Sequence, residues 1–249
     1  MLLPALALGL PEVERGAWTG GSSTSDLAVS LDGRYVATSQ RSTDAGLAIW
    51  DRLAPDEGPT LVDLCEATTV AFTTHATRGD AFYVGCGDDR VLRVVLDSDV
   101  VPPTARVEAT IVVGTDVETV VSIDWAEDDT VLHVVTSESN LFRLHRVDLA
   151  SDAVDGASGL PTATSGVAAD LAVAAGGTPV LIGQTDGSLF WASRSSTAYS
   201  SQETTPLSGT VSAIAVDPSG SSDVFLLALA SRGEVWTFSV ASPGATPTL

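Results

Sequence analysis

One short apolar phrase recurs five times along this 249-residue chain, and it constrains the fold more than any other feature. The copies are offset by 43, 53, 48 and 43 residues, and they are Leu27-Ala28-Val29, Val70-Ala71-Phe72, Ile123-Asp124-Trp125, Leu171-Ala172-Val173 and Ile214-Ala215-Val216. Each copy is followed by a turn and two further short apolar segments. A repeat of this length is typical of a β-propeller, in which every repeat folds into one four-stranded blade.

We therefore predict an all-β fold, a β-propeller of five four-stranded blades. Pairs rich in Asp and Gly, such as Asp32-Gly33 and Asp186-Gly187, would form the turns between successive strands. Residues 24–249 would be the propeller domain. Residues 1–23 would be a lead-in, either the remnant of a signal peptide or a latch strand for the last blade.

Two arrangements of the blades stay open. The ring closes with five blades, or the chain is part of a larger propeller of six to eight blades. An open sheet edge invites aggregation, so closure needs an outer strand for blade 5. Glu12–Trp18 could supply that strand and close the ring. Alternatively Ala245–Leu249 is the outer strand of blade 5, and the chain is the first part of the larger propeller.

The first repeat carries a specific resemblance. Leu31-Asp32-Gly33-Arg34-Tyr35-Val36-Ala37 and the later Leu47-Ala48-Ile49-Trp50-Asp51 resemble a blade of the WD-repeat family, in a divergent form of the kind found in bacterial proteins. Blade 5 is similar through Val216-Asp217-Pro218-Ser219-Gly220 and Val235-Trp236. The family's Gly-His pair before the first strand is absent in all five repeats. In the family, a polar network joins that His to the Asp of the blade. This network is therefore not expected in the present chain.

The charge of the chain excludes some classes of partner. Acidic side chains outnumber basic ones by 32 to 12, which gives a net charge of −20. Such a surface repels nucleic acid and anionic lipid. No stretch reaches the roughly 18 apolar residues that a membrane-spanning helix needs, so no membrane insertion is expected.

The acids are unevenly distributed along the chain. Half of them, 16 of 32, lie between Asp80 and Asp155. They either keep an apolar β-protein soluble or form a face on blades 2 and 3 for a basic partner.

The two cysteines of the chain, Cys65 and Cys86, fall at matching ends of neighbouring blades in this scheme. They either form a disulfide or remain two buried thiols. A disulfide would favour an extracellular or periplasmic location, to which the signal-like apolar start Met1–Leu10 also points. Two free thiols would leave a cytoplasmic location open.

No motif for metal, cofactor or catalytic chemistry is present. The histidines His75, His133 and His145 lack zinc-ligand spacing, and the sequence has no nucleophile elbow and no phosphate loop. We therefore expect no metal, no cofactor and no enzymatic activity, and interpret Asp124, the charged residue of the repeated phrase, as an acid solvated in the channel. The alternative is a carbohydrate-active propeller enzyme that uses channel carboxylates, including Asp124.

The expected function is a non-catalytic scaffold for a protein partner, in an exported or envelope protein and as a monomer. A further alternative is a structural module of a longer secreted chain. Loops on a rigid scaffold carry specificity, which favours the face formed by the turns between the second and third strands of each blade. The candidate interaction residues on this face are Arg41, Asp44, Arg90, Glu138, Asn140, Asp186 and Arg232.

Overall fold

The computed structural model describes residues 24–40, 46–100, 102–126, 130–139, 141–159, 168–174, 178–195, 198–203, 209–216, 224–229 and 233–239. The strands in these residues form five separate antiparallel sheets. The one helix described is the 3-10 helix η1, Pro55–Glu57, and no helix among these residues is long and apolar enough to cross a membrane.

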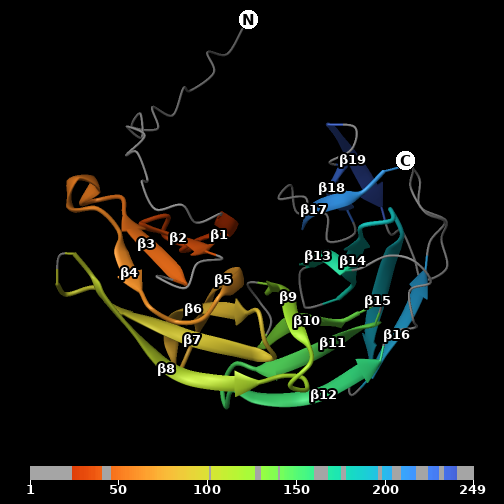
Figure 1. Ribbon diagram of the computed structural model, residues 1–249, viewed down its shortest axis with the longest axis horizontal. Coiled ribbons are helices and arrows are strands. Elements are labelled where there is room, and N and C mark those ends of the chain that lie inside the picture. Colours follow the sequence, from red (N-terminus) through yellow and green to blue (C-terminus); the bar gives the residue numbers. More distant parts are fainter. Residues whose placement is uncertain are drawn as a thin grey trace, which may run out of the picture.

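Each sheet is one blade of a five-bladed propeller, and its strands follow in sequence order from the axis outwards (Figure 1). Blade 1 contains β1 (Thr24–Val29), β2 (Tyr35–Gln40), β3 (Leu47–Asp51) and β4 (Thr60–Val62). Blade 2 contains β5 (Ala67–His75), β6 (Gly79–Cys86), β7 (Arg90–Asp97) and β8 (Thr104–Val112). Blade 3 contains β9 (Thr119–Asp124), β10 (Val131–Glu138), β11 (Leu141–Asp148) and β12 (Ala153–Gly159).

Blade 4 contains β13 (Ala168–Val173), β14 (Val180–Gln184), β15 (Leu189–Ser195) and β16 (Ala198–Glu203). Blade 5 contains β17 (Val211–Val216), β18 (Val224–Leu229) and β19 (Glu234–Ser239) in the residues described. Both segments proposed as its fourth strand, Glu12–Trp18 and Ala245–Leu249, lie outside those residues. The predicted architecture of five WD-like blades is confirmed.

The repeated phrase lies on the innermost strand of every blade, as predicted. Each of these strands has a β-bulge at the same place, and the bulged residues are Ser25, Thr68, Val121, Ala169 and Ser212. A bulge redirects the side chain that follows it. The next residue along each strand is called here the ring residue, and the five ring residues are Asp26, Thr69, Ser122, Asp170 and Ala213.

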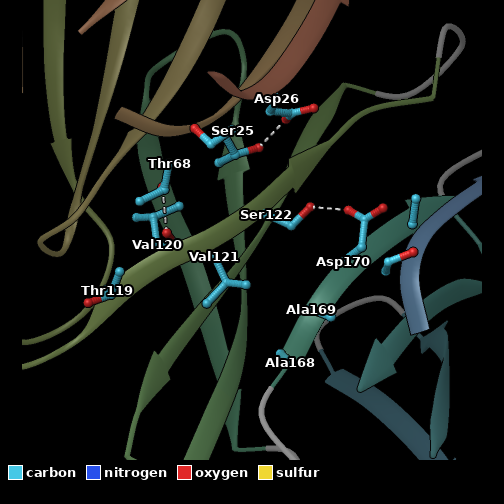
Figure 2. A pocket seen from close by; sticks show the side chains of 13 residues that line it. Ser25, Asp26, Thr68, Thr119, Val120, Val121, Ser122, Ala168, Ala169 and Asp170 are labelled. Carbon is cyan, nitrogen blue, oxygen red and sulfur yellow. Dashed lines mark hydrogen bonds between the residues drawn. The ribbon is translucent and has the colours of Figure 1, made fainter. Parts of the chain in front are cut away.

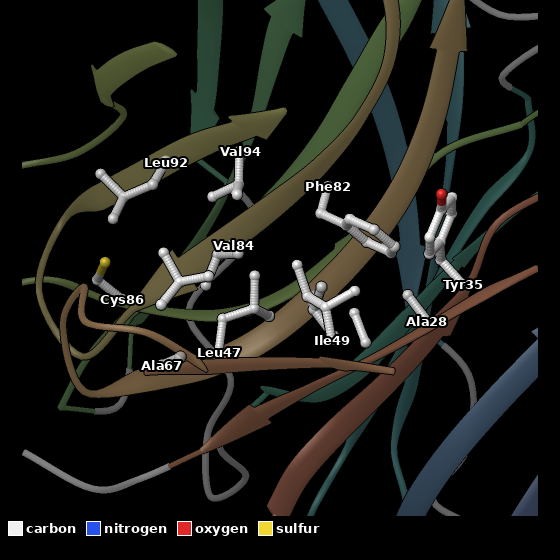
Figure 3. Packing of buried hydrophobic residues seen from close by; sticks show 13 residues of the cluster. Ala28, Tyr35, Leu47, Ile49, Ala67, Phe82, Val84, Cys86, Leu92 and Val94 are labelled. Carbon is white, nitrogen blue, oxygen red and sulfur yellow. The ribbon is translucent and has the colours of Figure 1, made fainter. Parts of the chain in front are cut away.

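The hydrophobic core is divided into layers between successive blades. In the first layer Ala28 and Ile49 of blade 1 pack against Val70, Phe82 and Val84 of blade 2 (Figure 3). Three further clusters repeat this arrangement between blades 2 and 3, 3 and 4, and 4 and 5. Blades 2 to 4 are therefore apolar on both faces, which explains the 44% hydrophobic content of a chain without a membrane-spanning helix among its described residues.

In two blades, a side-chain bond connects the loop before the blade to the blade's second strand. We call this bond a tie, and it occurs at the same position in both blades. In blade 2 the tie is a disulfide between Cys65 and Cys86, whose Cα atoms are 5.7 Å apart. In blade 3 the hydroxyl of Thr136 donates a hydrogen bond to the carboxylate of Glu118. Cys65 and Glu118 each precede their ring residue by four positions, and Cys86 and Thr136 each pair with the residue before the bulge. The covalent and the polar tie are structural equivalents.

The sequence predicts a fourth strand of blade 1 over Pro59–Cys65 with Cys65 at its end, and the structure corrects this detail. Strand β4 ends at Val62, so Cys65 lies in the connection between blades 1 and 2. From this loop Cys65 bonds to Cys86, the last residue of β6.

The ring of blades is continuous from blade 1 to blade 5. The innermost strands pack in the order β1, β5, β9, β13 and β17. Among the described residues, β17 and β1 do not pack on one another as closely as these pairs do.

The disulfide gives a first testable prediction. It closes a loop across a sequence separation of 21, and the chain-entropy treatment of such a loop gives a stabilisation of about 3 kcal/mol. The double variant Cys65→Ala, Cys86→Ala should lose about this much free energy of unfolding in urea denaturation. Reduction of the wild type should produce a similar loss and should not affect the variant further. An unchanged urea midpoint after verified reduction would contradict the prediction.

Candidate functional site

The central channel is lined by the innermost strands of all five blades. The alternative function, a carbohydrate-active enzyme, would place its catalytic carboxylates in this channel. One cavity of about 430 Å³ contains the ring residues and their neighbours (Figure 2). A second cavity of about 390 Å³ is lined by the repeated phrase and also reaches three carboxylates, Asp26, Asp124 and Asp170. The chemistry of this channel depends on what those carboxylates bond to.

The side chain of each of the first four ring residues accepts a hydrogen bond from the backbone of the next blade. Asp26 Oδ2 accepts from Val70 N at 3.0 Å and from the Thr69 hydroxyl at 2.7 Å. Thr69 Oγ1 in turn accepts from Ile123 N at 3.3 Å. These bonds connect blade 1 to blade 2 and blade 2 to blade 3.

The same pattern continues through the next two blades. Ser122 Oγ accepts from Leu171 N at 3.3 Å and donates to Asp170 Oδ1 at 2.7 Å (Figure 2). Asp170 Oδ2 accepts from Ile214 N at 2.8 Å. The fifth ring residue, Ala213, has no polar side chain, so the pattern ends at blade 5.

Asp124 lies one residue farther along its strand than Ile123 and bonds in a similar way. Its Oδ2 accepts from Val173 N of blade 4 at 2.8 Å. Burial raises the pKa of Asp124 to about 7, and the nearby Asp170 and Asp26 act in the same direction against the backbone hydrogen bonds. Asp124 thus lines the channel cavity, as expected, and is half-buried there, with one carboxylate oxygen bonded to the backbone of blade 4.

Burial also raises the pKa of Asp170, while its hydrogen bonds from Ile214, Ser122 and Leu171 oppose the shift. Asp26, Asp124 and Asp170 thus act as acceptors that join neighbouring blades. The described residues contain no group of three or more side chains suited to hold a metal ion.

A second polar cluster in blade 3 has the residue types of a catalytic group, but all of its members except one arginine are buried. Thr136 bonds both Glu118 and, at 2.7 Å, His145 Nε2, and the Arg143 guanidinium pairs with Glu118. Burial, assisted by Arg143, lowers the pKa of His145 to about 4, so its imidazole is neutral near pH 7. Thr136 is 0% exposed and Glu118 and His145 are each 2% exposed, which makes this a structural network.

The blade that resembles a WD repeat is also stabilised internally. Asp51 of the Trp50-Asp51 pair is buried, and its carboxylate accepts hydrogen bonds from Arg34 Nε and Nη2 and from Leu53 N. The Arg34–Asp51 ion pair holds the pKa of Asp51 below its usual value against the effect of burial. An arginine in the β1–β2 turn of the same blade thus bonds the blade Asp in this chain.

The predicted interaction face is only partly described. Arg41, Asp44, Asn140 and Arg232 lie outside the described residues. The three others, Arg90, Glu138 and Asp186, lie at the turns β6–β7, β10–β11 and β14–β15. Up-and-down connectivity places these turns on one face of the propeller.

Two of these three side chains have local contacts. Arg90 forms an ion pair with Asp88 of its own turn at 2.7 Å, and both side chains are about two-fifths exposed. Asp186 Oδ1 accepts from Ser188 N at 2.9 Å, which fixes the turn. The structure does not bring the three into contact with one another, so they would form a dispersed charged surface.

The ring residues were missed as a set by the sequence analysis. The signal was present, because the residue before the repeated phrase is Asp, Thr, Ser and Asp in the first four copies and Ala in the fifth. The sequence analysis used the apolar trio itself and did not compare the residues that precede it. Their shared role, bonding to the next blade, is visible only in the structure, where the bulges place all five residues along the channel.

These features define a class, the WD-repeat-like β-propeller, here with hydrogen bonds between blades along its channel. Comparison with solved structures supports this class. The β-propeller domain of Cps50 (Swd1) from Myceliophteria thermophila is similar with a TM-score of 0.64 and 11% identity, over 91% of this chain and 72% of that one. A chain of the Mitotic Checkpoint Complex is similar with a TM-score of 0.53 and 13% identity, over 90% of this chain and 79% of that one.

At these identities the likeness establishes the fold alone. No protein-family model matches the chain, and no curated protein sequence matches it. The fold is thus shared with WD-repeat propellers, while the sequence has diverged.

Asp124 gives the second testable prediction. Its pKa is raised in the folded state, so between about pH 4 and pH 7 the folded chain binds a proton that the unfolded chain releases. The contribution of this group to stability is therefore lost as the pH rises through that window. Asp124→Asn keeps an oxygen for Val173 N and removes the titration.

Thermal unfolding of both proteins from pH 4 to pH 8 measures the effect. The variant should gain about 2–6 °C in Tm over the wild type across the window. A constant difference, or one that shrinks with rising pH, would contradict the assignment.

Proposed function

We propose that this chain is a non-catalytic scaffold that binds a protein partner through its propeller surface. The observation that carries the proposal is the bonding of the channel carboxylates. Asp26, Asp124 and Asp170 each accept a backbone N–H from the neighbouring blade, so their role is accounted for by the fold.

The comparisons support the same proposal. One of the similar chains belongs to the Mitotic Checkpoint Complex, a multiprotein assembly, and the other is a β-propeller domain. A rigid propeller displays loops at fixed positions, which suits recognition of another protein. We propose further that the partner is not a nucleic acid, given the net charge of −20, and that the chain is a monomer in an exported or envelope location. The Cys65–Cys86 disulfide supports an oxidising compartment.

The face that carries Arg90, Glu138 and Asp186 gives the third testable prediction. The variant Arg90→Ala, Glu138→Ala, Asp186→Asn removes three charges, and Asn at 186 retains an acceptor for Ser188 N. It should fold with an unchanged Tm, because exposed ion pairs contribute little stability. Its affinity for the partner captured by the wild type should fall about tenfold or more.

The matched control removes three exposed charges from the opposite face. Asp56→Ala, Glu57→Ala and Asp99→Ala lie on the β3–β4 and β7–β8 connections and should leave partner capture unchanged. Equal capture by both variants would reject this face, and absence of any specific partner for the wild type would reject the scaffold.

A carbohydrate-active enzyme is the competing function, because three carboxylates line one channel cavity. Such an enzyme needs two available carboxyl groups about 5–10 Å apart. Hydrolysis of any substrate in a broad glycan panel, abolished in Asp124→Asn, would favour this alternative over the scaffold.

A further inference from the structure

The outer edge of blade 2 is the longest outer edge that the structure describes. Its last strand, β8, has nine residues, whereas β4, β12 and β16 have three, seven and six. In the described part of the chain no strand pairs with the outward side of β8, which lies on the rim of the propeller (Figure 1). An edge of this kind presents backbone N–H and C=O groups to an incoming strand.

The middle of this edge is open to solvent. Val107 is 42% exposed, and the side chains of Arg106 and Glu108 are 72% and 36% exposed. Blades 1 and 3 pack on the two faces of blade 2, in the apolar layers on either side of it. A further blade at any other place in the ring would therefore leave the outward side of β8 uncovered.

The order of residues along β8 is complementary to itself. Residues 104–110 are Thr-Ala-Arg-Val-Glu-Ala-Thr, which reads the same in both directions except that Arg106 and Glu108 exchange places. When two copies of such a strand pair antiparallel about Val107, Arg106 of each copy lies opposite Glu108 of the other. Val107 then lies opposite its own copy, on the two-fold axis that such a pairing requires.

The charges around Glu108 favour this arrangement. Its carboxylate contacts the buried Arg93 of β7, and it lies 3.7 Å from Arg78 Nη2 and 3.8 Å from Arg106 Nη2. One carboxylate is thus shared among three guanidinium groups. Arg106 is the most exposed of the three and makes the longest of these contacts. A second carboxylate opposite Arg106 would complete its ion pairing.

Two features of β8 would hinder its pairing with most other strands. The register with β7 skips Glu108, so β8 has a bulge at this residue, and bulges and charges both protect a sheet edge. In the antiparallel pairing about Val107 the charges attract, whereas a parallel pairing in register would place Arg106 opposite Arg106. The bulge limits regular pairing to a few residues, so this edge selects its own copy but binds it weakly.

We propose that β8 is the interface of a weak two-fold dimer, in which the β8 strands of two copies pair antiparallel about Val107. The two copies of blade 2 then form one continuous sheet of eight strands. A few paired residues bury less than the roughly 1,200 Å² of stable interfaces, and the net charge of −20 on each copy adds repulsion. We expect a Kd of about 10–100 µM, so the monomer proposed above is the form of the dilute chain.

A cysteine at the axis tests the geometry. Val107→Cys places the two introduced thiols opposite one another, and both native cysteines of the chain are already in the disulfide. At about 100 µM and under mild oxidation, this variant should form a covalent dimer, seen at twice the monomer mass in non-reducing denaturing electrophoresis.

The matched control is Val112→Cys, which changes another exposed valine of β8. It lies five residues from the axis, so its two copies would be about 30 Å apart and should not cross-link. Absence of the covalent dimer from Val107→Cys, or equal cross-linking of both variants, would overturn the proposal.

Analytical ultracentrifugation of the protein without added cysteines tests the charge pairing. Arg106→Glu places two glutamates opposite one another at each ion pair and should weaken self-association about tenfold or more. Arg52→Glu makes the same change of charge at an exposed arginine of blade 1 and should leave association unchanged. Both variants should keep the wild-type Tm, because the altered side chains are exposed. A wild type that stays monomeric up to about 1 mM, or equal weakening by both variants, would contradict the dimer.

Discussion

The hydrogen bond between a ring residue and the backbone of the next blade is the interaction on which the rest of the structure depends. It fixes the distance between innermost strands, and the apolar layers farther out can interdigitate only when that distance is set. Gly85 shows how close the blades come, because a Cβ at this position would lie 2.5 Å from Val120 of blade 3. A polar contact at the axis and tight packing outside it are two parts of one junction.

The same bond explains why carboxyl groups are tolerated at the axis. A buried charge without partners is costly, and the raised pKa of Asp124 and of Asp170 reflects that cost. Each carboxyl group is compensated by N–H donors whose positions are fixed by the neighbouring sheet. The acidity of the channel is therefore a consequence of how the blades are joined, and it is distinct from the excess of acids on the surface.

The sequence predicted the architecture because the repeated phrase and its turns are local signals. The innermost strands, the hairpins and the apolar character of both blade faces followed from residue patterns alone. The bonding of Asp124 did not, since the Val173 N–H that its carboxylate accepts belongs to the neighbouring sheet and cannot be read from residues near Asp124 in the sequence. The correspondence between Cys65–Cys86 and Glu118–Thr136 was also hidden, because the two pairs share positions in the fold but no residue type.

The alanine at position 213 has a consequence for how such a molecule comes apart. In a linear array each unit is held by its neighbours, and the end units are held on one side only. The Ile214 N–H of blade 5 donates to Asp170 of blade 4, but Ala213 has no side-chain acceptor for a further blade. Under force or at the onset of denaturation, separation should begin at this blade and proceed towards the covalently tied blade 2, so that the propeller unzips in one direction.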